Sequence, residues 1–477
     1  MNKTILCKEG YLVPKNEKYK NQIELAKKEL NVEPYKSFLI NKNAERVHFN
    51  VYQENDEFLS VPKFYGLKKF GLPDQNNEIQ GEKIKINFKG QLRPEQIEII
   101  DKVLPYLIKN NGGVLCLPCA AGKTVLALYL AVQFKVKVLI IVHKTNLINQ
   151  WVKRTEEFTD ASIGIIQQNK INIDGKDIVI GMLQSIAKDK YDPNIFRDFG
   201  LVIFDEAHHA PSEFFSKALP IISCKITIGL SATPKRTDKM EKILYWYFGD
   251  IMYKAKIEEN NKVLVNIINY DIEHEKFKEC LMYTGNINRP KTINKITSIG
   301  RRNKFIIDTM EKVLQEVGRK ILVLSDRLDH LKLLKKRFDE RKITSSDFYI
   351  GSMKQKDLDK ASDAQVIFAS YGMAAEGLDI PALNTLFMVT SRKEIVQPVG
   401  RVIRKINPDI RPIIYDFIDQ LPSFINQGRY RMKLYKKMGF EIIIEKVFNN
   451  EIINKNIEEQ TINCDNCDNC DNCDFLD

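Results

Sequence analysis

The stretch Gly112–Phe134 reads GGVLCLPCAAGKTVLALYLAVQF and decides the fold of the chain around it. An apolar run, Val114–Leu117, meets a short loop of small residues, and an apolar segment of helical character begins at Thr124. This order predicts a strand, a loop and a helix, with Gly122 and Lys123 at the junction. Such a junction binds phosphate through backbone N–H groups and the helix dipole, and its lysine and hydroxyl reach phosphate oxygens and Mg²⁺.

The loop departs from the usual phosphate-binding pattern at one position. That pattern begins with a glycine five residues before Gly122, and this chain has Leu117 there. If the stretch is taken alone, a coincidental GKT in an unrelated α/β protein is the alternative. The motifs further along the chain decide between the two.

The composition favours a polyanionic partner. The chain has 477 residues, enough for about two to four domains, and its 73 Lys+Arg against 62 Asp+Glu give a net charge of +11. AT-rich codons alone also produce a sequence rich in Lys, Asn and Ile, so charge is a weak argument by itself. The N-terminus lacks a signal peptide, no apolar run is long enough to span a bilayer, and five of the nine cysteines are scattered like free thiols. We therefore expect a soluble intracellular protein, cytoplasmic or nuclear, with no membrane partner.

The alternation of strands and helices divides the chain into four regions. Residues 1–88 predict a small α+β accessory domain, in which Lys63–Phe70 mixes lysines with aromatics and indicates either a nucleic-acid surface or a small core with a solvated rim. Residues 89–258 and 259–447 each predict a doubly wound α/β domain of parallel strands buried on both faces. Only the first of these two domains carries a phosphate loop. Residues 448–477 predict a disordered acidic tail.

Short apolar runs mark the strands of the two α/β domains, and the region around 256–300 is less regular. The expected strands are Gly113–Leu117, Val136–Val142, Asp177–Met182, Leu201–Phe204 and Lys225–Leu230 in the first domain, and Lys320–Leu324, Phe348–Ile350, Gln365–Ser370, Thr385–Val389 and Pro412–Phe417 in the second.

The tail contains a perfect tandem of CDN triplets between Cys464 and Cys473. Four cysteines at this spacing are able to ligate zinc or part of an iron–sulfur cluster. Structural zinc sites usually pair two knuckles across a longer span, so a disordered repeat is the interpretation that we favour.

Two carboxylates follow the apolar strand Leu201–Phe204. They are Asp205 and Glu206, and we place the phosphate loop on the adjacent strand, so that both acids reach the γ-phosphate. Asp205 would hold Mg²⁺ and Glu206 would polarise the attacking water. The next strand ends in small hydroxyl residues, including Ser231, which are able to hydrogen-bond to the acidic strand.

A basic motif, QPVGRVIR, lies at Gln397–Arg404 in the second α/β domain. Its arginines, Arg401 and Arg404, are one helical turn apart and point from one face. Arginines presented by a second domain complete a phosphate site in the first and stabilise transition-state charge. A basic helix with surface ion pairs is the alternative reading of this motif alone.

The order of these motifs resembles superfamily 2 helicases of the DEAH-box kind, over residues 92–440. The resemblance rests on LRPEQ (Leu92–Gln96), LPCAAGKT (Leu117–Thr124), DEAH (Asp205–His208), SAT (Ser231–Thr233), EGLDIP (Glu376–Pro381) and Gln397–Arg404. Within the superfamily the chain is most similar to XPB-type transcription and repair helicases and to poxvirus-type transcript-release helicases. This similarity implies two tandem RecA-like domains.

The resemblance also implies roles for individual residues. ATP would be bound by Gln96, which reads adenine, by Gly377 and Asp379 of the second domain, and by the loop Leu117, Pro118, Cys119, Ala120, Ala121, Gly122, Lys123 and Thr124. Mg²⁺ would be held by Thr124 and Asp205. Catalysis would use Lys123, Asp205 and Glu206, with His208 as the coupling residue and Arg401 and Arg404 as trans-domain fingers. Nucleic acid would be contacted by Lys144, Gln150, Trp151, Gly181, Gln184, Ser185, Ser370 and Gly372.

The resemblance further implies a helicase or translocase that acts on DNA in transcription or repair, with RNA as the alternative track. Three other interpretations remain: a translocase that displaces proteins or stalled polymerase without unwinding, a non-catalytic scaffold, and a nuclease-linked motor. The intact motifs disfavour the scaffold, and residues 1–88 offer no acid–lysine cluster for a nuclease. The abundance of Lys, Asn and Ile, which AT-rich codons encode, together with the resemblance to viral helicases, indicates a virus-encoded protein.

Overall fold

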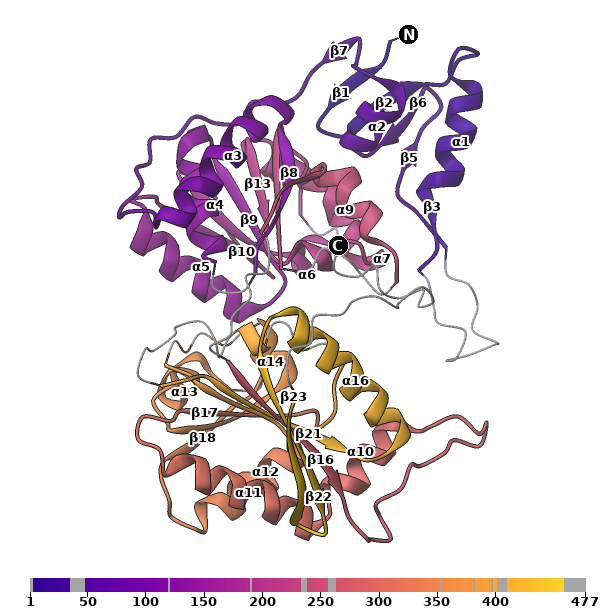
Figure 1. Cartoon of the computed structure of the whole chain (residues 1–477). Coiled ribbons are helices and arrows are strands. Elements are labelled where there is room, and N and C mark those ends of the chain that lie inside the picture. The colour runs from indigo at the N-terminus through magenta and orange to yellow at the C-terminus, as the bar shows by residue number, and fades with distance from the viewer. Residues whose placement is uncertain are drawn as a thin grey trace. The chain divides into compact units, whose positions relative to one another are not determined.

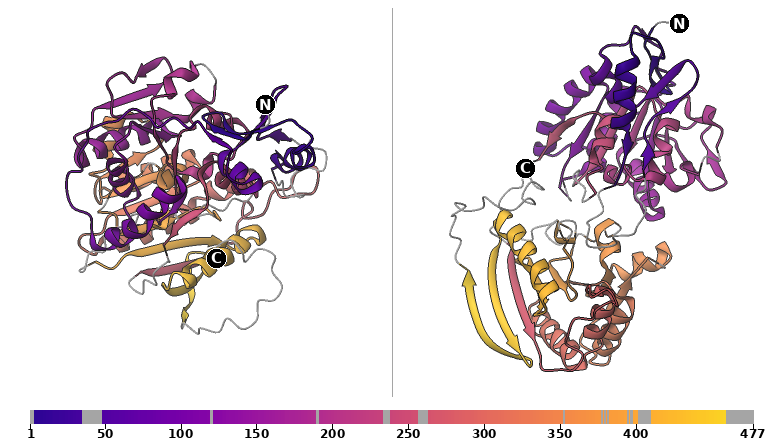
Figure 2. Two further views of the ribbon diagram at one scale, coloured as in Figure 1. Left: turned by 90° about the horizontal axis from the view of Figure 1, so that it is seen from above. Right: turned by 90° about the vertical axis from the view of Figure 1, so that its right-hand side faces the viewer.

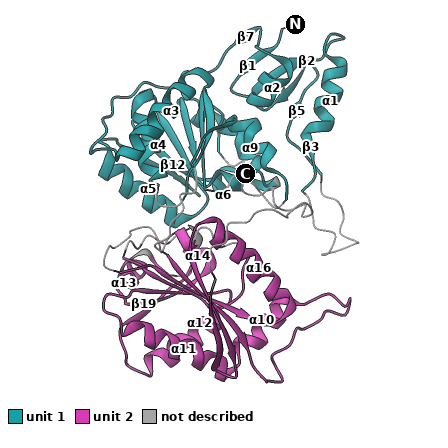
Figure 3. Cartoon of the chain, viewed as in Figure 1, with its two compact units in different colours: residues 1–255, 477 teal, residues 256–476 magenta. Residues whose placement is uncertain are grey.

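Two compact units make up the chain, residues 1–255 and residues 256–476 (Figure 3). The structure is a computed structural model. It describes residues 3–34, 48–118, 121–188, 191–232, 238–255, 263–351, 353–376, 378, 380, 382–393, 395, 398–400 and 410–458.

The first unit is built around an eight-stranded sheet in the order β11-β10-β12-β9-β13-β14-β8-β15 (Figure 1). All neighbouring strands are parallel except the β10–β11 pair. The strands are β8 (Gly112–Cys116), β9 (Val138–Val142), β10 (Ile163–Gln167), β11 (Lys170–Asn172), β12 (Ile178–Met182), β13 (Leu201–Phe204), β14 (Ile226–Ser231) and β15 (Ile251–Lys254). The helices are α3 (Pro94–Asn110), α4 (Lys123–Phe134), α5 (Thr145–Phe158), α6 (Leu183–Ile186), η1 (Pro193–Phe196), η2 (Ala207–His209), α7 (Glu213–Ser216), α8 (Ala218–Ile221) and α9 (Glu241–Phe248).

All five strands expected in this domain are present, and every residue of β8, β9, β12, β13 and β14 is buried. The prediction of strands buried on both faces is therefore confirmed. The predicted adjacency of the phosphate loop and the acidic strand is wrong, because β14 lies between β8 and β13. Parallel strands still bring all three carboxyl ends to one edge of the sheet.

The first residues carry a small sheet of their own, in the order β5-β6-β2-β1-β7. Its elements and their neighbours are β1 (Ile5–Cys7), β2 (Gly10–Pro14), α1 (Lys20–Leu30), β3 (Asn31–Val32), β4 (Phe49–Asn50), β5 (Gln53–Glu54), β6 (Phe58–Val61), α2 (Lys63–Phe70) and β7 (Gln75–Asn76).

Helix α2 joins this small sheet to the rest of the first unit. The Lys63 ammonium is buried, 2.5 Å from the Glu78 carboxylate, and donates to the Lys225 carbonyl at 2.7 Å. The Tyr65 and Trp246 rings meet edge to face at 5.5 Å. Lys63 and Tyr65 thus belong to a small core, whereas Lys68 is exposed at its rim, in agreement with the second of the two expected readings.

The second unit contains another eight-stranded sheet, in the order β18-β19-β17-β20-β21-β16-β22-β23. Only β23 is antiparallel to its neighbour. The strands are β16 (Leu264–Asp271), β17 (Ile321–Ser325), β18 (Ser346–Tyr349), β19 (Val366–Ser370), β20 (Thr385–Met388), β21 (Ile413–Asp419), β22 (Glu441–Phe448) and β23 (Glu451–Glu458). The helices are α10 (Arg289–Thr297), α11 (Gly300–Leu314), α12 (Leu328–Asp339), α13 (Gln355–Ala361), α14 (Tyr371–Glu376) and α16 (Pro422–Lys437).

Three strands of this sheet differ from expectation. Strand β16 runs between β21 and β22 inside a segment expected to be irregular, because Asn266 and Asn269 interrupt its apolar run. Strands β22 and β23 form a long antiparallel pair at one edge of the sheet, drawn yellow in Figure 2. The ordered sheet therefore continues to Glu458, past the boundary expected at residue 447. The CDN repeat lies outside the described residues.

Buried arginines hold the carboxyl ends of the second sheet together. Arg302 forms a bidentate pair with Asp419 at 2.6 and 2.9 Å and also donates to the Val389 carbonyl. Arg431 forms a bidentate pair with Asp416 at 2.7 Å for both contacts. All four side chains are fully buried, so removal of one partner would leave an uncompensated charge, at a cost of about 3–5 kcal/mol.

No helix within the described part of the chain combines the length and apolar character that a membrane span requires.

We expect Gly66→Ala to destabilise the first unit. A Cβ on Gly66 would lie 2.3 Å from the Cβ and Cγ of the buried Tyr11, which has no room to move. Overpacking of this kind costs about 1–3 kcal/mol, against about 1 kcal/mol gained when alanine replaces glycine in a helix. Thermal unfolding followed by circular dichroism should show a lower melting temperature. The matched control is Gly372→Ala, a helical glycine with no atom within 4 Å of the added Cβ, and equal melting of the two variants would contradict the packing argument.

Candidate nucleotide and nucleic-acid sites

The phosphate loop connects β8 to α4, as the sequence predicts. Its start is fixed to the neighbouring strand, because the Leu117 N–H donates to the Ser231 carbonyl at 3.1 Å. Lys123 is the first residue of α4, and its ammonium donates back to the Leu117 carbonyl at 3.4 Å. The lysine therefore lies over its own loop, where it is able to meet a bound phosphate. Cys119 and Ala120 lie outside the described residues.

Gln96 closes the loop from the side of α3. Its side-chain oxygen accepts the Arg93 N–H at 3.0 Å, and its amide nitrogen donates to the Ala121 carbonyl at 3.4 Å. Gly122 has a φ of +81°, and a Cβ there would lie 2.3 Å from the Gln96 amide nitrogen. Glycine is required at this position both by backbone conformation and by space. The sequence indicated Gln96 as an adenine contact, which stays a prediction, and gave no sign of this second contact.

Asp205 lies at the end of β13 with its carboxylate held in place. One oxygen accepts the Trp151 indole N–H at 2.8 Å, and the other accepts the Glu206 N–H at 3.0 Å. Burial and the charge of Glu206 raise the pKa of Asp205, whereas the Trp151 hydrogen bond and Lys123 oppose this shift. The carboxylate is thus costly to keep charged without a cation beside it.

Glu206 adopts a left-handed backbone with a φ of +49°, which is uncommon for a residue with a side chain. Its Oε2 atom is buried and has no hydrogen-bond partner among the described residues, and the imidazole Nδ1 of His208 lies 3.5 Å away. His208 Nδ1 also lies 3.3 Å from the Ser231 hydroxyl, so it links β13 to β14. This confirms that the hydroxyl end of β14 reaches the acidic motif.

The donor set fits Mg²⁺ and a water nucleophile. Thr124 is half-buried at the first turn of α4, and Asp205 supplies a buried carboxylate of raised pKa. Hard oxygen donors of this kind suit Mg²⁺ held partly by substrate phosphates. The unpartnered Glu206 oxygen is an acceptor that a water molecule would satisfy.

The predicted nucleic-acid residues of the first unit divide into two groups. Lys144 lies just before α5 and Gln150 lies on it, and both side chains are half-buried. The other two residues have partners within the protein: the Gln184 amide donates to the His143 carbonyl, and the Ser185 hydroxyl accepts the Gln168 N–H at 3.0 Å. Their contacts with nucleic acid stay predictions.

Trp151 and Gly181 are both buried, and their contacts with nucleic acid also stay predictions. Trp151 is only 1% exposed and its indole N–H donates to Asp205, so its side chain supports the acidic site. Gly181 lies inside β12, where an added Cβ would lie 3.0 Å from Ile186 and 3.1 Å from Ile141. Packing of the core therefore explains this glycine.

In the second unit, Ser370 ends β19 and Gly372 is exposed on α14. The predicted residues Gly377, Asp379, Arg401 and Arg404 lie outside the described residues. Arg431 lies on α16 and forms the buried ion pair with Asp416 described above.

Comparisons with known proteins agree with this arrangement. A profile of the family described as "Type III restriction enzyme, res subunit" matches residues 89–236. A protein named "Putative ATP-dependent RNA helicase L396" from Acanthamoeba polyphaga mimivirus is 35% identical over 471 residues, which cover 96% of this chain and 89% of the relative. The chain belongs to the superfamily 2 helicases.

Other relatives of this helicase are more distant. "Probable helicase D10" of Escherichia phage T5 is 29% identical and covers 68% of this chain and 71% of the relative. "DNA 3'-5' translocase XPB2" of Sulfurisphaera tokodaii is 26% identical and covers 67% and 80%.

Two solved structures share the fold. The Type ISP restriction-modification enzyme LlaBIII bound to DNA has a TM-score of 0.51 at 17% identity, and covers 73% of this chain and 30% of that one. Dbp5 of S. cerevisiae bound to RNA and ADP BeF3 has a TM-score of 0.50 at 11% identity, and covers 75% and 94%. The expected fold of tandem RecA-like domains is confirmed.

We expect Trp151→Phe to weaken the use of Mg²⁺ by this helicase. The change keeps an aromatic ring but removes the N–H that orients the Asp205 carboxylate. Loss of such a supporting contact typically costs about 10- to 100-fold in metal affinity or activity. The measurement is the ATPase rate against Mg²⁺ concentration. Trp246→Phe is the matched control because the Trp246 ring packs edge to face on Tyr65, whereas the Asp205 carboxylate accepts from Trp151. Identical Mg²⁺ curves for both variants would refute the role given to Trp151.

Proposed function

We propose that this helicase is a DNA-tracking motor that acts in transcription or repair and hydrolyses ATP at the edge of the first sheet. The observation that carries the proposal is the pair of buried carboxylates, Asp205 and Glu206, one oriented by Trp151 and the other with an unpartnered oxygen. A site that buries two acids is costly unless a cation and a reacting group meet them there.

Each residue of the site has a distinct task in this proposal. Lys123 leaves the Leu117 carbonyl and binds the β- and γ-phosphates. Thr124 and Asp205 hold Mg²⁺, which would neutralise phosphate charge when bound. The free oxygen of Glu206 accepts a hydrogen bond from the attacking water and takes its proton. His208 transmits the state of the site to β14 through the Ser231 hydroxyl.

The second RecA-like domain completes the site in this proposal. Arg401 and Arg404 supply positive charge to the transferring phosphate, and Gly377 and Asp379 contact the ATP cleft. Alternating closure and opening of the two domains converts hydrolysis into directed movement along the strand. The support is the motif order of Glu376–Pro381 and Gln397–Arg404 in the sequence.

DNA is the proposed track, with RNA as the alternative. The net charge of +11 suits either polymer, and the relatives carry both names, a DNA translocase and RNA helicases. The relative named a translocase also supports a second candidate function, in which movement along the strand displaces a bound protein such as a stalled polymerase. A protein-displacement assay beside a duplex-unwinding assay separates these two functions.

We predict that nucleic acid stimulates ATP hydrolysis and that Lys123→Ala abolishes it, because a principal phosphate-binding charge is lost. The experiment measures the steady-state ATPase rate alone and with single-stranded DNA, duplex DNA or single-stranded RNA, with Lys123→Ala as the blank. The polymer that stimulates the ATPase rate is identified as the nucleic acid along which the protein moves. Wild-type turnover in Lys123→Ala would contradict the assignment of the loop.

We predict a different defect for Glu206→Gln. The substitution keeps the size of the side chain but removes the base, so ATP still binds while hydrolysis falls by about 10²-fold or more. Equilibrium binding of a fluorescent ATP analogue and single-turnover hydrolysis measure the two steps. Loss of nucleotide binding would show that Glu206 acts in binding and that its proposed role is wrong.

A further inference from the structure

A turn between β16 and α10 exposes apolar side chains on the second unit. Leu281, Met282 and Ile287 are exposed, and Tyr283 at the tip is 102% exposed, the value of a fully solvated ring. The loop before α10 projects from the body of the unit in Figure 1. Exposed apolar groups gathered in this way mark a contact surface.

The base of this turn is firmly built. The Cys280 N–H donates to the Thr292 hydroxyl at 2.9 Å, and the Asn288 N–H donates to the Cys280 carbonyl at 2.6 Å. The Met282 N–H donates to the Asn286 carbonyl at 2.7 Å, so the tip closes as a tight hairpin. The ring of Tyr283 is thus presented by an ordered support.

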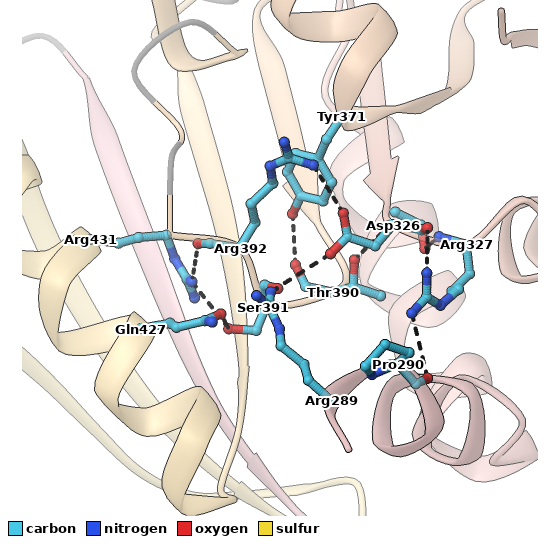
Figure 4. A network of polar contacts seen from close by, with 11 residues as sticks. Arg289, Pro290, Asp326, Arg327, Tyr371, Thr390, Ser391, Arg392, Gln427 and Arg431 are labelled. Atoms are coloured by element: carbon cyan, nitrogen blue, oxygen red, sulfur yellow. Dashed lines mark hydrogen bonds and ion pairs between the residues drawn. The ribbon is translucent and has the colours of Figure 1, made fainter. Parts of the chain in front are cut away.

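Three arginines, Arg289, Arg327 and Arg392, lie near the Asp326 side chain (Figure 4). Arg289 follows the turn directly and donates to the Ser391 carbonyl at 2.5 Å, 3.8 Å from Asp326. Arg392 reaches Asp326 at 3.1 Å and lies over the Tyr371 ring.

The third arginine, Arg327, has only weak contacts. Its guanidinium donates to the carbonyls of Asp326 and Pro290 at 3.4 and 3.5 Å. Among the described residues, Asp326 is the one acid that forms ion pairs with these arginines, and its two partners are Arg289 and Arg392. The excess positive charge therefore lies at the carboxyl ends of β17 and β20.

We propose that the turn 280–288 and the three arginines bind one strand of nucleic acid, with a base stacked on Tyr283 and backbone phosphates on Arg289, Arg327 and Arg392. The inference rests on the proposed function and names residues for it outside the motifs. Tyr283 and Arg289 are six residues apart, at most about 20 Å of extended chain, so one strand reaches both. Single strands are bound without sequence preference by an aromatic ring on which a base stacks, combined with cationic side chains that contact the backbone. The charge favours a polyanion over an apolar protein surface.

The test measures binding of the full chain to a fluorescein-labelled single-stranded DNA oligonucleotide of mixed sequence. Tyr283→Ala is expected to weaken binding about 10-fold, whereas Tyr283→Phe retains the ring and binds like the wild type. Val317→Ala is the control, because Val317 is 91% exposed on the same unit and far in sequence from the turn. All three changes are on the surface and leave folding intact.

The salt dependence of binding gives a second readout. Arg289→Gln and Arg392→Gln should each reduce the slope of log affinity against log salt by about 0.7, the value for one phosphate contact on a single strand. Tyr283→Ala should lower affinity and leave the slope unchanged, since stacking releases no counterions.

The outcomes separate this inference from the proposed function. A wild type that neither binds the oligonucleotide nor is stimulated by any polymer contradicts both. A wild type that binds and is stimulated, with Tyr283→Ala indistinguishable from it, overturns only the inference and assigns the turn to a protein contact. Equal losses in Tyr283→Ala and Tyr283→Phe would also overturn it, because stacking requires only the ring.

Discussion

The absence of a side chain at Gly122 is the constraint on which the nucleotide site depends. The Gln96 amide occupies the space that a Cβ would take, and through it the first turn of α3 is fixed to the phosphate loop. The left-handed backbone at Gly122 then directs the chain into α4, so that Lys123 starts the helix and lies back over the loop. A residue with a side chain would disturb both arrangements at once.

The nucleotide site also requires that two negatively charged side chains, Asp205 and Glu206, be stabilised although they are buried. Asp205 and Glu206 are both buried, and the indole N–H of Trp151 gives the Asp205 carboxylate a neutral hydrogen-bond donor. A neutral donor orients the carboxylate without cancelling its charge, which leaves that charge available to a cation. Glu206 has an unusual backbone and an unpartnered oxygen, the kind of local strain and unmet acceptor that structures retain at functional sites.

The second unit uses arginine in two different ways. Arg302 and Arg431 are buried in bidentate pairs with aspartates and serve to hold strand ends together. Arg289 and Arg392 share the Asp326 carboxylate, whereas Arg327 donates only to backbone carbonyls, so positive charge is in excess around Asp326. An arginine that has its own carboxylate partner therefore stabilises the fold. Arginines that outnumber the carboxylates around them retain positive charge with which they are able to bind an anion.

The sequence by itself determined the two parallel sheets, the phosphate loop and the acidic motif, because these depend on local apolar runs and on motifs of contiguous residues. It did not reveal β16, whose asparagines break the apolar run, nor the position of β14 between the loop strand and the acidic strand. Tertiary structure alone decided that Trp151 supports Asp205 and that Gln96 closes on Gly122. It alone also decided that Arg289 and Arg392, distant in the chain, share one carboxylate. Such contacts join residues far apart in sequence, and no local pattern encodes which of many polar side chains meet.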